Sequence, residues 1–200
     1  MSAAAVILSL LLLSATPASP QRTFFPNDVF SGYRLGNSFA VEWYSRDLKA
    51  LDEPSLWELS QRDKQAVAYR FLWIRAFDNP IAVRVTISPN GAGDVVIKVS
   101  NGAGGYGPGH PVQNESRALT TTDVADLMAR IQSTDFWKIP TAESMKGVGM
   151  DGAEWVLEGV SDGNYHVVTR WSPEKGSYRK LCLFFIHDLA RLKIPRSRIY

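Results

Sequence analysis

Alternation of apolar and polar residues predicts strands in two regions of the chain. Residues 66–77 are largely apolar on both alternating faces, which indicates a strand inside a sheet or covered on both sides. Residues 81–87 alternate cleanly, and a Pro-Asn-Gly turn connects them to a returning strand at 94–99. A second hairpin is predicted at 153–171, where two alternating runs flank the turn sequence SDGN.

Helical spacing of apolar residues predicts three helices. The first begins at Ser38, a residue that can cap it, and Pro54 stops it. The second covers roughly 122–133 after a Thr-rich cap, and the third covers 177–192. The apolar stripe of the first helix comprises Phe39, Trp43, Leu48 and Leu51.

The order of these elements predicts an α+β fold: an antiparallel sheet of about five strands from two hairpin regions, with three helices packed mainly on one face. A single domain is expected over residues 38–192. An extended lead-in at 19–37 precedes it, and a basic tail at 193–200, expected to fray, follows it. Residues 101–116 are expected to form a Gly-rich loop.

Composition and charge exclude several classes of protein. The chain has 200 residues, 45% of them hydrophobic, which is an ordinary globular composition rather than that of a disordered chain. Twenty-two Lys and Arg against 20 Asp and Glu give a net charge of +2, too small for a broad field that attracts nucleic acid. The single cysteine, Cys182, lies in an apolar stretch and is expected to be buried.

The N-terminal 18 residues are typical of a signal peptide. Their apolar run, residues 3–13, would cross only about half of a bilayer as a helix. Small residues follow at Thr16-Pro17-Ala18, where a signal peptidase could cut. We expect export to the periplasm or outside, with no transmembrane span in the mature chain. The absence of any Lys or Arg before Arg22 leaves retention as an uncleaved anchor open.

Two catalytic motifs match in letters and fail in context. Residues 102–107 (GAGGYG) satisfy the dinucleotide fingerprint, but the PGHP that follows cannot begin the phosphate-binding helix. Gly104, Gly105 and Tyr106 remain ligand-binding candidates, through an anion nest of glycine amides or with the tyrosine as a lid. Ser161 sits in a G-x-S-x-G match, but it leads into a strand and so indicates a hairpin turn. No cofactor or metal pattern is found.

The second hairpin carries an unusual number of ionisable groups. Glu154 and Glu158 share one face of their strand, and His166 and Arg170 share one face of the other. Whether the two pairs share a side of the sheet depends on the length of the turn, which leaves the register open. If they do, an ion-pair ladder is the simpler interpretation, and an acid–base site with Arg170 for an anionic ligand is the functional one. The two glutamates are about 13 Å apart at strand spacing, too far for a glycosidase pair.

Six tryptophans are more than a chain of this size needs. Trp73, Trp137, Trp155 and Trp171 have apolar neighbours and are expected in the core. Only Trp43 and Trp57 have surroundings polar enough for an exposed platform.

Several segments together resemble a group of small exported bacterial proteins of unassigned function. The resemblance covers most of residues 40–190 and implies a bacterial source, export and a single domain. It implies no activity, cofactor or site residue. The segments that carry it are 42–45 (EWYS), 69–75 (YRFLWIR), 102–106 (GAGGY), 151–155 (DGAEW) and 165–173 (YHVVTRWSP).

These observations predict an exported, non-catalytic binding or interaction domain. Its expected partner is an envelope or extracellular protein, bound through a sheet edge or the Gly-rich loop. A hydrolase or transferase using Glu154, Glu158, His166 and Arg170 is the alternative, and it requires those side chains to converge in a cleft. Carriage of a small ligand is a third hypothesis. The sequence predicts no oligomeric state.

Overall fold

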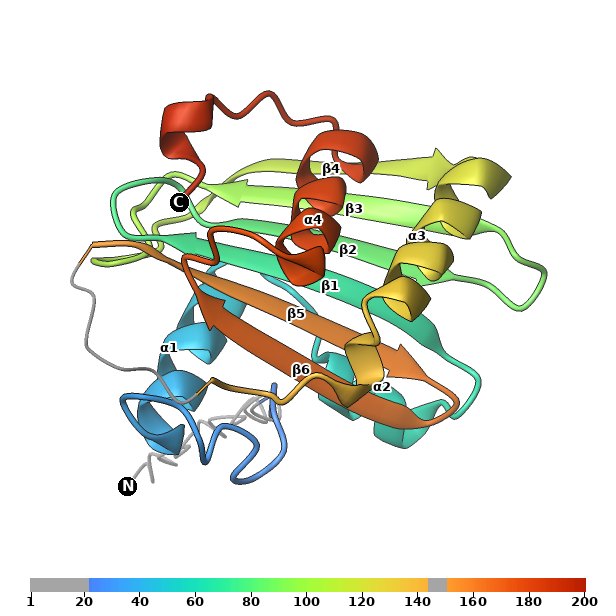
Figure 1. Cartoon of the computed structure of the whole chain (residues 1–200), viewed down its shortest axis with the longest axis horizontal. Helices are drawn as coiled ribbons and strands as arrows, with labels where there is room; N and C mark the ends of the chain where they lie inside the picture. The colour runs from blue at the N-terminus through green and yellow to red at the C-terminus, as the bar shows by residue number, and fades with distance from the viewer. Residues whose placement is uncertain (1–21, 144–150) are drawn as a thin grey trace, which may run out of the picture.

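The fold is an α+β arrangement around one antiparallel sheet, seen in a computed structural model that describes residues 22–143 and 151–200 (Figure 1). The predicted signal peptide and the first residues of the lead-in lie outside this range. The described helices are α1 (Asn37–Ala50), α2 (Leu56–Arg62), α3 (Thr121–Ser133) and α4 (Ser177–Phe184). The strands are β1 (Val67–Arg75), β2 (Ile81–Ile87), β3 (Gly93–Ser100), β4 (Pro111–Leu119), β5 (Ala153–Ser161) and β6 (Asn164–Trp171).

The six strands lie in the order β4-β3-β2-β1-β5-β6. Both predicted hairpins are confirmed, as β2–β3 and β5–β6. β1 lies in the interior of the sheet with both of its faces buried, as its apolar pattern predicted. No helix among the described residues is long and apolar enough to cross a membrane.

The expected counts of strands and helices were too low. Part of the predicted Gly-rich loop forms β4, an edge strand whose polar residues match its exposed position. Helix α2 was missed because it is only seven residues long, although Ser55 caps it by accepting a hydrogen bond from the Glu58 amide.

The helices cover both faces of the sheet, not mainly one. In Figure 1, α3 and α4 cross in front of the sheet, whereas α1 and α2 lie behind it. Alternation along β1 supplies both cores: Phe71 and Trp73 pack on the α3/α4 side, and Leu72 and Ile74 on the α1 side. The second core exists because the lead-in is not simply extended. Its turns bury Phe24, Phe25, Phe30 and Tyr33 with α1.

The C-terminal residues pack against the molecule instead of fraying. Ile199 and Tyr200 contact the front core, and the Trp155 indole donates a hydrogen bond to the Tyr200 backbone oxygen at 2.8 Å. The Tyr200 hydroxyl donates to Asp78, which also pairs with Arg198. The C-terminal segment therefore packs on the molecule through its apolar residues, and its basic residues face the solvent.

A buried ionic network joins the α1–α2 connection to the sheet. Arg70 on β1 pairs with Glu158 on β5 at 2.5 Å and with Glu53 from the connection at 3.2 Å. All three side chains are fully buried. Arg84 and Lys98 approach Glu53 from β2 and β3. Burial lowers the pKa of Arg70, but the two carboxylates outweigh it and raise that pKa, so the guanidinium is charged.

Removing one member of this network leaves a buried charge without its partner. We expect Glu158→Ala to lower the free energy of unfolding by about 3–5 kcal/mol, measured by urea denaturation. Lys138→Ala, which breaks the exposed pair with Asp135, is the matched control and costs at most about 1 kcal/mol. A loss for Glu158→Ala no larger than that of the control would contradict the structural role given to the network.

Candidate functional site

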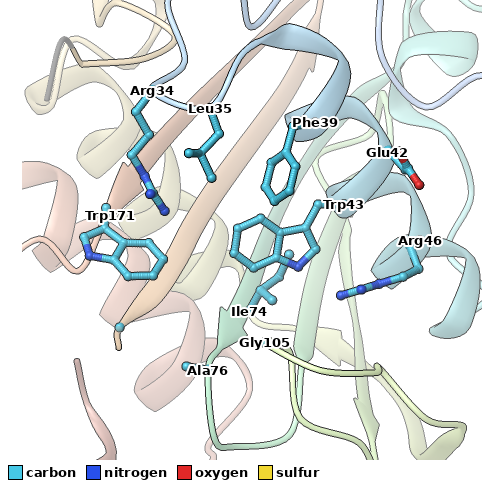
Figure 2. A pocket seen from close by; sticks show the side chains of 11 residues that line it. Arg34, Leu35, Phe39, Glu42, Trp43, Arg46, Ile74, Ala76, Gly105 and Trp171 are labelled. Carbon is cyan, nitrogen blue, oxygen red and sulfur yellow. The ribbon is translucent and has the colours of Figure 1, made fainter. Parts of the chain in front are cut away.

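A cleft of about 460 Å³ opens between α1 and the end of the sheet (Figure 2). Its walls come from the lead-in, α1, the end of β1, the Gly-rich loop and the ends of the β5–β6 hairpin. Most of the lining is apolar. The lining residues are Arg34, Leu35, Phe39, Glu42, Trp43, Arg46, Ile74, Ala76, Gly105, Gly152 and Trp171.

Helix α1 carries two apolar faces, and only one of them packs on the sheet. The buried face comprises Ala40, Tyr44, Asp47 and Leu48. Phe39 and Trp43 lie one turn apart on the neighbouring face and line the cleft. Their rings are in edge-to-face contact, with 5.5 Å between the ring centroids. The predicted stripe therefore mixed core residues with cleft residues. The presence of two adjacent apolar faces on α1 is the sequence signal that could have separated them.

The Gly-rich loop forms one wall because its backbone runs directly over the end of β1. The Gly104 amide donates to the Arg75 carbonyl at 2.9 Å, and the Gly105 amide donates to the Ala76 carbonyl at 3.2 Å. A Cβ on Gly104 would lie 2.3 Å from a methyl carbon of Ile74. Gly105 thus lines the cleft as a backbone surface. The predicted anion nest is not formed, because these amides are occupied by carbonyl groups.

Side chains of helix α1 hold the Gly-rich loop in place through hydrogen bonds. The Trp43 indole and the Arg46 guanidinium both donate to the Gly104 carbonyl, at 3.2 and 3.0 Å. Arg46 also contacts the Tyr106 carbonyl at 3.4 Å. The Tyr106 side chain itself is exposed and is not part of the lining, and its ring centroid lies 6.3 Å from that of Phe77. The predicted ligand-binding loop therefore contributes to the cleft, with Gly105 in the lining and Tyr106 beside it.

Trp171 forms the opposite wall and is half-buried, so the prediction that it lies in the core was wrong. Its ring packs over Gly152, where a Cβ would lie 2.5 Å from the indole. The Arg34 guanidinium lies over this ring at 4.3 Å from the centroid. Trp137, also predicted as core, is exposed, whereas Trp73 and Trp155 are fully buried as predicted.

Glu154 is buried next to the lining residue Arg34 and belongs to a network of hydrogen bonds. It accepts hydrogen bonds from the hydroxyls of Tyr33, Tyr44 and Thr169, and from Arg34 at 3.2 Å. Burial and the Glu154 charge raise the pKa values of both tyrosines, so they remain hydrogen-bond donors at neutral pH. The network joins the lead-in and α1 to β5 and β6, and it positions Arg34.

The predicted acid–base residues do not converge. Glu154 and Glu158 face α1 and α2, and Arg34 and Arg70 neutralise them. His166 and Arg170 point to the other face of the sheet, because they pair with Gly159 and Trp155 in the β5–β6 register. The sheet separates the two pairs, so the condition that both the ladder and the hydrolase alternative required, a shared side, is not met.

His166 and Arg170 have structural partners on their own side. His166 bonds the Ile139 carbonyl at 2.9 Å, and burial lowers the pKa of its ring. Arg170 pairs with Glu143 at 2.8 Å and donates to the carbonyls of Pro140 and Thr141, which tie residues 140–143 to the sheet edge.

The remaining chemical candidates have local structural explanations. Ser161 ends β5 and pairs with Asn164 across a two-residue turn, and both turn residues, Asp162 and Gly163, have positive φ. Cys182 is buried, and this burial raises the pKa of its thiol. In the described part of the chain, no group of three or more His, Cys, Asp or Glu side chains could hold a metal ion.

Comparison of the chain with protein-family models, curated proteins and solved structures finds no match. The function must therefore be inferred from the geometry of the cleft.

The close approach of the Gly-rich loop to β1 is testable with two alanine substitutions. We expect Gly104→Ala to lower the free energy of unfolding by about 1–3 kcal/mol, because its Cβ would overlap Ile74 and the Arg75 carbonyl. Gly107→Ala in the same loop meets nothing within 4 Å and is expected to change stability by less than about 0.5 kcal/mol. Thermal and urea denaturation measure both variants. Equal losses of stability in Gly104→Ala and Gly107→Ala would show that the loop does not contact β1 in this way.

Asp47 predicts a pH dependence of stability. Burial raises its pKa to about 6, despite its contact with Arg46. The folded protein therefore holds a proton that the unfolded chain releases near pH 4, so stability falls as pH rises from about 4 to about 6. Asp47→Asn should remove this fall, worth about 3 kcal/mol at most, in denaturation curves from pH 4 to pH 7. The exposed Asp94→Asn variant should retain it, and a fall that persists in Asp47→Asn would contradict the assignment.

Proposed function

We propose that this protein is an exported bacterial binding domain without catalytic activity, and that the cleft beside α1 is its site for a small amphipathic molecule. The observation that carries the proposal is the largely apolar lining of this cleft, which includes Leu35, Phe39 and the rings of Trp43 and Trp171. Seven large apolar side chains are exposed among the described residues. Two of them, Leu35 and Phe39, line the cleft, and two more, Phe77 and Tyr106, directly follow the lining residues Ala76 and Gly105 in the chain.

The size and lining of the cleft support a small-molecule ligand. A volume of about 460 Å³ lies in the range of sites that enclose drug-sized molecules, which are mostly apolar with a few polar groups. The walls supply three aromatic rings, from Phe39, Trp43 and Trp171, with Arg34 at one end. The exposed edge strand β4 is the other surface suggested for binding, but it begins with Pro111 and carries charged residues, features that discourage strand pairing.

The polar groups around the cleft support binding without catalysis. Glu154 accepts four hydrogen bonds from its surroundings, and Asp47 accepts two from Arg46. Neither of these carboxylates is placed as a general base for a ligand, and Glu42, the carboxylate in the lining, lies away from Arg34 and Trp171 in Figure 2. Export rests on the pattern of residues 1–18 and on the resemblance to exported bacterial proteins.

Binding of the uncharged dye Nile red tests the proposal. We expect the dye to bind the full chain with an increase in fluorescence, and Phe39→Ala to weaken binding by about 10-fold because an aromatic wall is lost. Met128→Ala removes another exposed apolar side chain on the opposite side of the sheet and should leave the affinity unchanged.

Three results would contradict the proposal: no dye binding, equal loss in the Phe39→Ala and Met128→Ala variants, or chemical conversion of a ligand recovered from the protein. Because Phe39 is about half exposed, its truncation should leave the melting temperature nearly unchanged.

A further inference from the structure

Arg34 is the one positively charged side chain that is nearly buried in the wall of the cleft. Its side chain is 6% exposed and lies between the Tyr33 and Trp171 rings, 5.5 and 4.3 Å from their centroids. In Figure 2 it extends from the lead-in toward Trp171, at the end of the cleft away from Arg46. The two rings restrict the guanidinium to one orientation, so its hydrogen bonds are directional.

The internal partner of Arg34 uses only part of its hydrogen-bonding capacity. A guanidinium has five N–H groups, and only Nη2 donates, to Glu154 Oε1 at 3.2 Å. Nε is buried without an acceptor, and Nη1 has none among the described residues. Glu154 cannot readily supply more, because three hydroxyl groups share its two oxygens with Arg34.

The other charged residues of the lining do not compete for this end. Arg46 is paired with Asp47 and bonded to the Gly-rich loop. Glu42 lies on the far side of Trp43 in Figure 2, directed away from Arg34 and Trp171. A ligand that enters between the aromatic walls therefore meets Arg34 with unused donors at the Trp171 end, Glu42 and Arg46 at the other end, and apolar surface between them.

We infer that the ligand is an amphipathic monocarboxylate, with its carboxylate at Arg34 and its apolar body between Trp171, Trp43 and Phe39. A carboxylate can accept hydrogen bonds from Nη1, which is not buried and has no acceptor among the described residues. Burial of the apolar body supplies most of the affinity. This inference deepens the proposed function and rests on it.

Calorimetric titration of the full chain with octanoate, octan-1-ol and octylamine tests the inference, because the three probes share one apolar chain and differ in the head group. We expect octanoate to bind about 10-fold or more tightly than the alcohol, and the amine to bind most weakly. Lowering the pH until octanoate is protonated should abolish its advantage over octan-1-ol. These measurements need no variant and therefore do not depend on the folding of one.

The Arg34→Gln variant tests the assigned residue. Octanoate should lose about 10- to 100-fold more affinity than octan-1-ol and Nile red lose, because only octanoate carries a charge for Arg34 to bind. Arg130→Gln, a substitution of an arginine on α3 across the sheet, is the control and should change nothing. A cooperative transition in urea denaturation checks that Arg34→Gln is folded.

Each alternative outcome separates the two proposals. Equal affinities for octanoate and octan-1-ol would mean that the unused donors hold only water, and would overturn the inference while the cleft remains a binding site. Tightest binding of octylamine would overturn it in the same way. Failure of all three probes with Nile red still binding overturns the monocarboxylate, whereas failure of Nile red as well overturns the proposed function.

Discussion

Two buried glutamates on β5 anchor the N-terminal part of the chain to the rear face of the sheet. Glu158 forms an ion pair with Arg70, which also pairs with Glu53 from the α1–α2 connection. Glu154 accepts hydrogen bonds from the hydroxyls of Tyr33 and Tyr44. Charges in a low-dielectric interior require nearly complete pairing, so these contacts permit few other placements of α1. The second hydrophobic core forms in the same layer. Every feature of the cleft that involves the lead-in or α1 depends on this anchoring.

The cleft results from a limit on how much of α1 the sheet can cover. The face containing Tyr44 and Leu48 packs on the strands, and the face containing Phe39 and Trp43 lines the cleft together with Ile74 of β1. The Gly-rich loop lies between α1 and the end of β1. The absence of side chains at Gly104 and Gly105 lets its backbone pass close to β1. Trp171 closes the other side. An apolar hollow with an arginine at one end is the consequence, and binding of an amphipathic molecule is the role it best fits.

Much of the fold was readable from local patterns. Alternation found both hairpins, and the Thr120–Asp123 capping box marked the start of α3 because cap and helix are neighbours in sequence. The site was readable only in part. Gly105 and Trp43 were singled out, but Arg34, Leu35, Phe39 and Trp171 were not assigned to any site. Nothing local distinguishes Trp171 from the core residue Trp155, since both follow the same alternating hairpin pattern.

The sequence by itself determined the α+β class, the two hairpins and the structural nature of the two false motifs, because these depend on contacts between near neighbours in the chain. Only the tertiary structure decided which face each ionisable residue of the β5–β6 hairpin occupies, since the strand register separates Glu154 and Glu158 from His166 and Arg170. It also decided that Arg34 meets Trp171 and Glu154, residues more than 100 positions away. Such contacts arise from the packing of α1 and the lead-in against β5 and β6, which no local periodicity encodes.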